Sequence, residues 1–117
     1  MKTVYTAVPK YLHFAKDHIN RYVLEKEFAP ITPYYGPFWM LDTVKRQKVR
    51  SANKAYIKSA DQVWIFGATK GPGEEKVHGL NVTDGVLEEK KLAEELGKKV
   101  RTFKVNLENQ EIQEAVP

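Results

Sequence analysis

Strand-like and helix-like segments alternate along this chain, and the alternation restricts its possible folds more than any other feature. Short runs rich in β-branched and aromatic residues predict strands, and stretches with apolar residues three and four apart predict helices. The expected strands are residues 2–8, about 31–34, 62–67 and 99–105, and the expected helices are residues 11–28, 43–58 and 84–96. This order predicts an α/β fold: a small Rossmann-like (flavodoxin-like), mostly parallel sheet of four to five strands with helices on both faces.

Two segments lie outside this alternation. Residues 68–83 are polar and contain three glycines and one proline, so we expect a loop. A connection of this length is unusual in a compact domain and is often functional. The tail, residues 106–117, is expected either as a short helix with Leu107 and Ile112 facing inward or as a loose end.

Length and composition exclude several classes of protein. With 117 residues, the chain is expected to form one domain, 1–117. It contains no apolar run long enough to span a membrane and no features of a secretory signal, so we expect a cytoplasmic protein. The absence of cysteine excludes disulfides, thiol nucleophiles and cysteine metal sites, and three dispersed histidines predict no metal site.

The charge balance is weakly informative. The net charge is +4, but 19 basic and 15 acidic residues are spread along the chain, so we do not expect nucleic acid as a partner. The positive excess suits a phosphorylated metabolite. Trp39 and the neighbouring Tyr34 and Tyr35 could stack on a base or pack the loop, and exposed aromatic surface around Trp39 predicts a homo-oligomer.

Glu89 is the most informative residue. Val86, Ala93 and Leu96 lie three before, four after and seven after it, which places all four on one stripe of the expected helix. A carboxylate therefore occupies a position where the pattern requires an apolar side chain. It is either a nucleophile or acid/base group near the N-terminus of the helix, or a partly buried glutamate that reaches solvent or pairs with a lysine.

Four further residues are candidates for the same site, and each also has an ordinary structural explanation. Tyr5, in the first strand, can place a hydroxyl in a cleft or serve as a core aromatic residue. Asp84 is an ordinary helix cap, and Gly85 could allow a ligand to approach the helix N-terminus. Asn53 is a poor helix former in the middle of a helix and is either functional or simply exposed.

Three segments in this order resemble the nucleoside 2-deoxyribosyltransferase superfamily, including its deoxynucleotide N-glycosidase relatives. They are KTVYTA at the N-terminus, SADQVWIFG in the middle, and DGVLEEKKLAEELGKKVRTF near the end. The last segment carries a G-x-x-x-E-x-x-x-A-x-x-x-GK pattern, which here reads Gly85, Glu89, Ala93, Gly97 and Lys98. The resemblance follows the whole chain in order, and the matching motifs account for about a third of it.

The resemblance implies roles for individual residues. Glu89 matches the nucleophile that attacks C1′ of the deoxyribose, and Tyr5 matches the tyrosine that orients it. Asp84 lies within one residue of an aspartate that recognises sugar or base. Asn53 falls near an acidic residue that assists base protonation in the transferases, and an amide cannot act as a general acid. The chain is also shorter than the transferases, without the C-terminal extension that helps complete a neighbouring subunit's site.

Two hypotheses for function follow. In the first, the protein cleaves or transfers the N-glycosidic bond of a (deoxy)nucleoside or nucleotide through a glutamate nucleophile, without metal or organic cofactor. In the second, it is a non-catalytic nucleotide-binding or sensing module on the same fold. A third and weaker possibility is nucleic-acid binding through the positive surface, which would depend steeply on salt.

Overall fold

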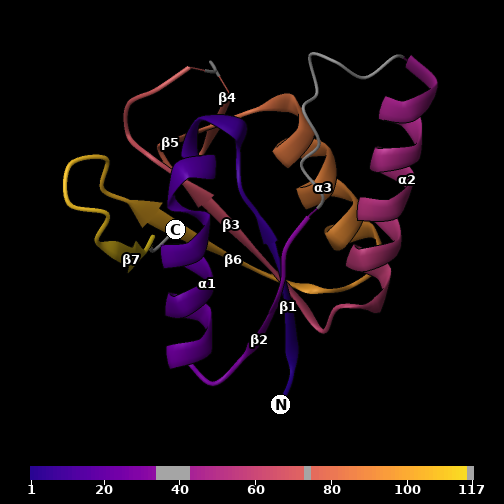
Figure 1. The fold of residues 1–117 in the computed structure, drawn as a ribbon, viewed down its shortest axis with the longest axis horizontal. Coiled ribbons are helices and arrows are strands. Elements are labelled where there is room, and N and C mark those ends of the chain that lie inside the picture. The colour runs from indigo at the N-terminus through magenta and orange to yellow at the C-terminus, as the bar shows by residue number, and fades with distance from the viewer. Residues whose placement is uncertain (34–42, 73–74, 116–117) are drawn as a thin grey trace.

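A computed structural model describes residues 1–33, 43–72 and 75–115 (Figure 1). Trp39, Tyr34 and Tyr35, on which the stacking and self-association expectations rested, lie outside the described residues. The elements are β1 (Thr3–Ala7), a 3₁₀ helix η1 (Lys10–Ala15), α1 (Lys16–Glu25), β2 (Ala29–Ile31), α2 (Thr43–Ser59), β3 (Gln62–Gly67), β4 (Glu75–Val77), β5 (Leu80–Val82), α3 (Asp84–Glu95), β6 (Lys99–Val105) and β7 (Ile112–Glu114).

The main sheet has five strands in the order β2-β1-β3-β6-β7. The pairs β1–β2, β1–β3 and β3–β6 are parallel, and only β7 runs antiparallel to its neighbour β6. The predicted α/β fold with a mostly parallel sheet is therefore confirmed. Strand order reverses between β1 and β3, and in sheets of this class ligands bind beyond the carboxyl ends of the strands at such a point.

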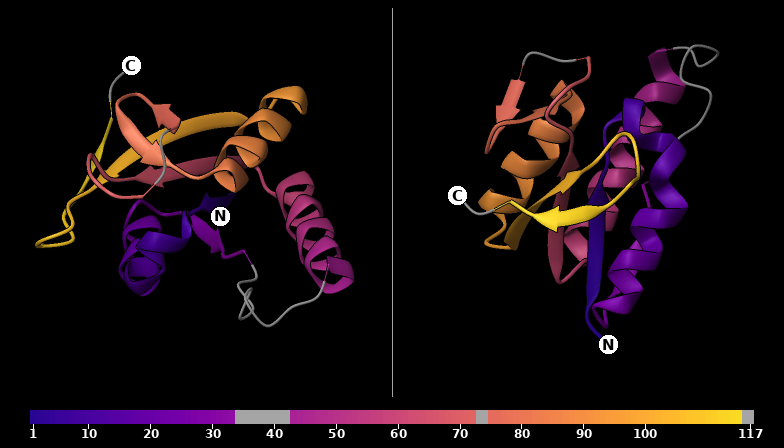
Figure 2. Two further views of the ribbon diagram at one scale, coloured as in Figure 1. Left: turned by 90° about the horizontal axis from the view of Figure 1, so that it is seen from above. Right: turned by 90° about the vertical axis from the view of Figure 1, so that its left-hand side faces the viewer.

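Helices cover both faces of the sheet, as predicted. Viewed from above, α1 lies on one side of the sheet and α3 on the other (Figure 2). On the α1 side, Val4 and Val8 pack with the aromatic rings of β3 and β6. On the opposite side, Tyr5 and Ala7 pack with residues of α2 and α3. Successive side chains of a strand point to opposite faces, so the alternation in β1 assigns each residue to one of the two cores.

The expected helix 11–28 is two elements, and it ends earlier than predicted. Pro9 is the N-cap of η1. The tighter winding of this 3₁₀ helix places residues three apart in line, and this keeps both Leu12 and Ala15 buried. The chain then continues as α1 to Glu25. It turns at Glu27, which has a φ of 67°. β2 follows at once, because Ala29–Ile31 pairs with Thr3–Tyr5, and this moves the strand ahead of the expected 31–34.

The expected loop 68–83 contains an antiparallel hairpin, β4–β5, so that prediction was wrong in part. His78 and Gly79 form its two-residue turn, both with positive φ (48° and 80°), as type I′ hairpins require. The hydroxyl of Tyr11 ties the hairpin to the rest of the fold. It donates to the carbonyl of Asn81 and accepts a bond of 3.0 Å from the amide of Ala68.

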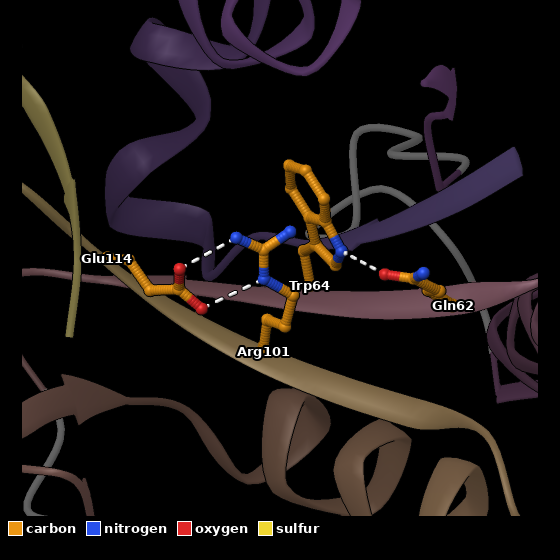
Figure 3. Close-up of polar contacts among 4 residues, drawn as sticks. All are labelled: Gln62, Trp64, Arg101 and Glu114. Carbon is orange, nitrogen blue, oxygen red and sulfur yellow. Dashed lines mark hydrogen bonds and ion pairs between the residues drawn. The ribbon is translucent and has the colours of Figure 1, made fainter. Parts of the chain in front are cut away.

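The expected short helix in the tail is a strand, β7. The other expected alternative, a loose end, does not describe this strand either. Of the two residues that the helical alternative placed inward, Leu107 is exposed and Ile112 packs against the core. Arg101 of β6 fixes the new strand through two bonds to the Glu114 carboxylate, of 2.8 and 2.6 Å (Figure 3). Its guanidinium also lies 4.6 Å from the centre of the Trp64 ring, a cation–π contact that covers an aromatic core residue.

Leu96 does not belong to the apolar stripe of α3. It is the C-cap residue, where the backbone has already left helical geometry, and its side chain is 41% exposed. Val86 and Ala93 are buried as predicted. Among the described helices, none is both long and apolar enough to cross a bilayer.

Candidate active site

A cavity of about 600 Å³ opens at the carboxyl ends of β1 and β2. Its floor is formed by Val8 and Lys10, which follow β1, and by Pro33, which follows β2. One wall is α2 and the other is the first half of α3, and both helices begin at this end of the sheet (Figure 1). The volume is within the usual range of about 300–1,000 Å³ for small-molecule sites.

Glu89 lines this cavity from α3. It lies between the buried residues Val86 and Ala93 of the same stripe, so most of its side chain is removed from water. Burial raises the pKa of the Glu89 carboxyl from 4.5 to about 7; the bond from Tyr5 lowers it, and the charge of Glu88 raises it further. A carboxyl group with a pKa near neutrality is typical of catalytic sites, although structural carboxyls also show such shifts.

Tyr5 binds the carboxylate of Glu89 from the side of the sheet. It is fully buried in the middle of β1, and its hydroxyl donates a hydrogen bond to Oε2 of Glu89. The two residues are 84 positions apart in the chain. They meet because β1 is an inner strand and α3 packs over it. Tyr5 is therefore the core aromatic residue that the sequence allowed, and its hydroxyl reaches the cavity-lining Glu89 rather than the cavity itself.

Asp84 and Gly85 form the first turn of α3 and line the same cavity. The N-cap residue is Thr83, in extended conformation, and not Asp84, so the expectation that Asp84 caps the helix was wrong. Asp84 is the first helical residue, and its side chain is exposed at the mouth of the cavity. Gly85 is helical, and a Cβ atom added there would meet nothing within 4 Å. Packing within the protein therefore does not require glycine at this position.

Asn53 lies on the facing wall, where it is partly buried among the cavity residues of α2. Four of the five residues predicted as site residues, Glu89, Asp84, Gly85 and Asn53, thus line one cavity, and Tyr5 bonds to the first of them.

Sequence reasoning missed the basic residues of this cavity. Lys10 contributes from the floor, and Arg46, Arg50 and Lys54 contribute from α2. A signal was present, because residues 43–59 contain no acidic residue and these three bases are spaced four apart, on one helical face. Glu88, whose side chain is exposed, also reaches the rim of the cavity.

Comparison with solved structures gives a likeness in fold. A 2-deoxyribosyltransferase from Leishmania mexicana superposes on this chain with a TM-score of 0.63, covering 97% of this chain and 79% of its own, at 18% sequence identity. At this identity the likeness establishes a shared fold. No protein-family model matches the chain, and no curated protein matches it.

Proposed function

We propose that this protein cleaves or transfers the N-glycosidic bond of a (deoxy)nucleoside or nucleotide, with Glu89 as the nucleophile. The observation that carries the proposal is the position of Glu89: a carboxylate fixed by a buried tyrosine, facing a cavity of about 600 Å³. The fold likeness to a deoxyribosyltransferase supports the same reaction class.

The reaction follows from the chemistry of a carboxylate beside a sugar. Tyr5 bonds Oε2, so we assign Oε1 as the attacking atom. Oε1 forms a bond to C1′ as the C1′–N bond breaks, and the electron pair of that bond leaves with the base. Water then attacks C1′ of the glycosyl ester, loses a proton to solvent and regenerates the carboxylate, or a second base attacks instead. In these steps the C1′–Oε1 bond breaks as water or the second base attacks, and the protein contributes the carboxylate of Glu89 and the hydroxyl of Tyr5.

The remaining site residues have supporting roles in the proposal. Asp84, at the cavity mouth, would accept hydrogen bonds from sugar hydroxyls, and Gly85 would let the sugar approach the first turn of α3. Asn53 would bond to the base or the sugar from the α2 wall. Because an amide cannot protonate a departing base, the site favours hydrolysis of reactive bonds over rapid exchange between neutral bases.

The test is release of free base from a panel of deoxynucleosides and their 5′-phosphates, followed by chromatography. Glu89→Gln keeps the shape of the side chain and its bond from Tyr5 but removes the nucleophile, so we expect release to fall at least about a thousandfold. Glu95→Gln is the matched control, because it makes the same change at an exposed position of α3 that does not line the cavity. Equal release by wild type and Glu89→Gln would refute the assignment of the nucleophile.

A non-catalytic nucleotide-binding module is the second candidate, and the amide at position 53 is the observation that favours it. In that case no substrate releases base, while ligands still raise the melting temperature of the folded protein. Glu89→Gln would then change affinity only modestly. Adding an acceptor base to an active preparation separates transfer from hydrolysis.

A further inference from the structure

The α2 wall of the cavity carries a row of three cations. Arg46, Arg50 and Lys54 follow one another at intervals of four residues, and all three line the cavity that contains Glu89. Over eight residues of helix the row extends about 12 Å along the wall. Residues four apart lie on the same side of a helix, so the three side chains are presented together.

These cations have no acidic partners in the part of the chain that the structure describes. The ion pairs found there are Lys90–Glu94 and Arg101–Glu114, both outside the cavity. Residues 43–59 contain no aspartate or glutamate that could neutralise the row within α2. Three like charges on one helical face repel one another, so an anion that enters the cavity is attracted to this wall.

The facing wall has the opposite character. Asp84, Glu88 and Glu89 all line the cavity from α3. A phosphate group is repelled by that wall and attracted by α2, whereas the uncharged sugar can lie against Glu89. The charge distribution therefore orients a ligand across the cavity, with its sugar toward α3 and its anionic end toward α2.

We infer that the α2 row of Arg46, Arg50 and Lys54 recognises a chain of phosphates attached to a nucleoside, so that the ligand of this site is a nucleoside di- or triphosphate or a pyrophosphate-linked nucleotide. A single phosphate group can contact one or two of these side chains. A row that continues over two turns of helix matches a longer anion, and arginine is well suited to phosphate oxygens because its guanidinium donates two parallel hydrogen bonds. This inference rests on the proposed function only for the position of the sugar.

The test is direct binding, measured by calorimetry on the Glu89→Gln protein so that no ligand is consumed. The probes are deoxyadenosine, its 5′-mono-, di- and triphosphates, NAD and inorganic triphosphate. We expect affinity to rise at least about tenfold from the nucleoside to the triphosphate and to fall steeply as salt is raised. NAD binding as tightly as the triphosphate would identify the pyrophosphate-linked form, and weaker NAD binding would identify the nucleoside di- or triphosphate.

Variants assign the effect to the row. Arg50→Gln is expected to weaken triphosphate binding at least about tenfold and to leave deoxyadenosine binding unchanged. Lys48→Gln is the matched control, because it removes the same charge from an exposed position on the same helix that does not line the cavity. Circular dichroism on each variant checks that α2 is intact.

Three results would overturn the inference: equal affinity for nucleoside and triphosphate, equal affinity for mono- and triphosphate, or equal losses in Arg50→Gln and Lys48→Gln. Failure of the proposed function is a separate result. If the protein binds triphosphates through α2 but releases no base, the phosphate site is supported and the proposed reaction is refuted. If the protein releases base equally from nucleosides and nucleotides, and Arg50→Gln does not change this release, the proposed reaction is supported and the phosphate site is refuted.

Discussion

The hydroxyl of Tyr5 in β1 donates a hydrogen bond to the carboxylate of Glu89 in α3, and this bond joins the centre of the sheet to the wall of the cavity. It opposes the effect of burial, because it stabilises the charged form of Glu89 while removal from water destabilises it. These two effects, together with the charge of Glu88, set the pH range in which Glu89 is ionised.

The activity of the protein should therefore increase with pH through neutrality. The nucleophile must be ionised, and the pKa of Glu89 is about 7. We therefore expect kcat/KM for base release to rise tenfold per pH unit below pH 7 and to level off above it. Tyr5→Phe removes the bond that lowers this pKa, and it should move the rising limb to higher pH. If the rising part of the pH profile of kcat/KM is unchanged in Tyr5→Phe, a group other than Glu89 controls it.

Glu89 should also make the fold less stable at high pH. The pKa of Glu89 is raised in the folded protein, so its ionisation destabilises the fold. This loss of unfolding free energy is absent below pH 4.5, develops between pH 4.5 and about 7, and is complete above that range. The difference corresponds to about 3 kcal/mol of unfolding free energy. Glu89→Gln should thus stabilise the protein at pH 8 and have little effect at pH 4.5, as measured by urea unfolding. Equal effects at both pH values would contradict the raised pKa.

Gly85→Ala should separate folding from function. The position is helical with open space around it, so alanine should leave the fold intact or stabilise it by up to about 1 kcal/mol. The added methyl group would occupy the cavity and should lower base release or ligand affinity. Gly97→Ala is the contrasting variant: its φ of 70° makes alanine unfavourable, and it should lose about 1 kcal/mol of stability. Full activity of Gly85→Ala would show that the ligand does not approach Gly85.

Asn53→Asp should alter the choice of leaving group. A carboxylic acid on the α2 wall could protonate a departing base, which the amide cannot do. We expect the variant to release neutral bases faster below pH 6 and to change little with 7-methylguanosine derivatives, whose base already carries a positive charge. The comparison of guanine with 7-methylguanine release, measured by chromatography, tests this. Equal effects on the two substrates would show that the residue at position 53 does not protonate the departing base.

The Arg101–Glu114 pair should stabilise the C-terminal part of the sheet. Arg101→Met is expected to cost more than Glu114→Gln, because it loses the contact over Trp64 as well as the ion pair. Each loss should be on the order of 1 kcal/mol in urea unfolding followed by tryptophan fluorescence. The pair holds the pKa of Glu114 below its usual value, so its contribution is present above pH 4.5 and is lost as the pH falls. Equal losses in the two variants would argue against the Trp64 contact.

The sequence predicted the parallel part of this fold because β1, β3 and β6 carry continuous or alternating apolar patterns. Glu89 was detectable for the same reason, as a carboxylate that interrupts the stripe of Val86 and Ala93. The hairpin β4–β5 was missed because its strands are three residues long and its turn is His-Gly, a weaker signal than Asn-Gly.

The strand β7 was missed because it depends on a contact formed only in three dimensions, between Arg101 and Glu114, which no local pattern reveals. The basic wall of the cavity escaped notice for a different reason. Arg46, Arg50 and Lys54 look like an ordinary solvated helix face until the fold places them opposite Glu89.

The two outer strands of the sheet, β2 and β7, are each three residues long. A strand at the border of a sheet offers unpaired amides and carbonyls to any other chain, and natural proteins restrict this with short strands, charged side chains or proline. Pro30 in the middle of β2 lacks an amide hydrogen, and Glu114 in β7 is charged. Each edge therefore resists the addition of a strand from another chain, which protects this mostly parallel sheet from aggregation.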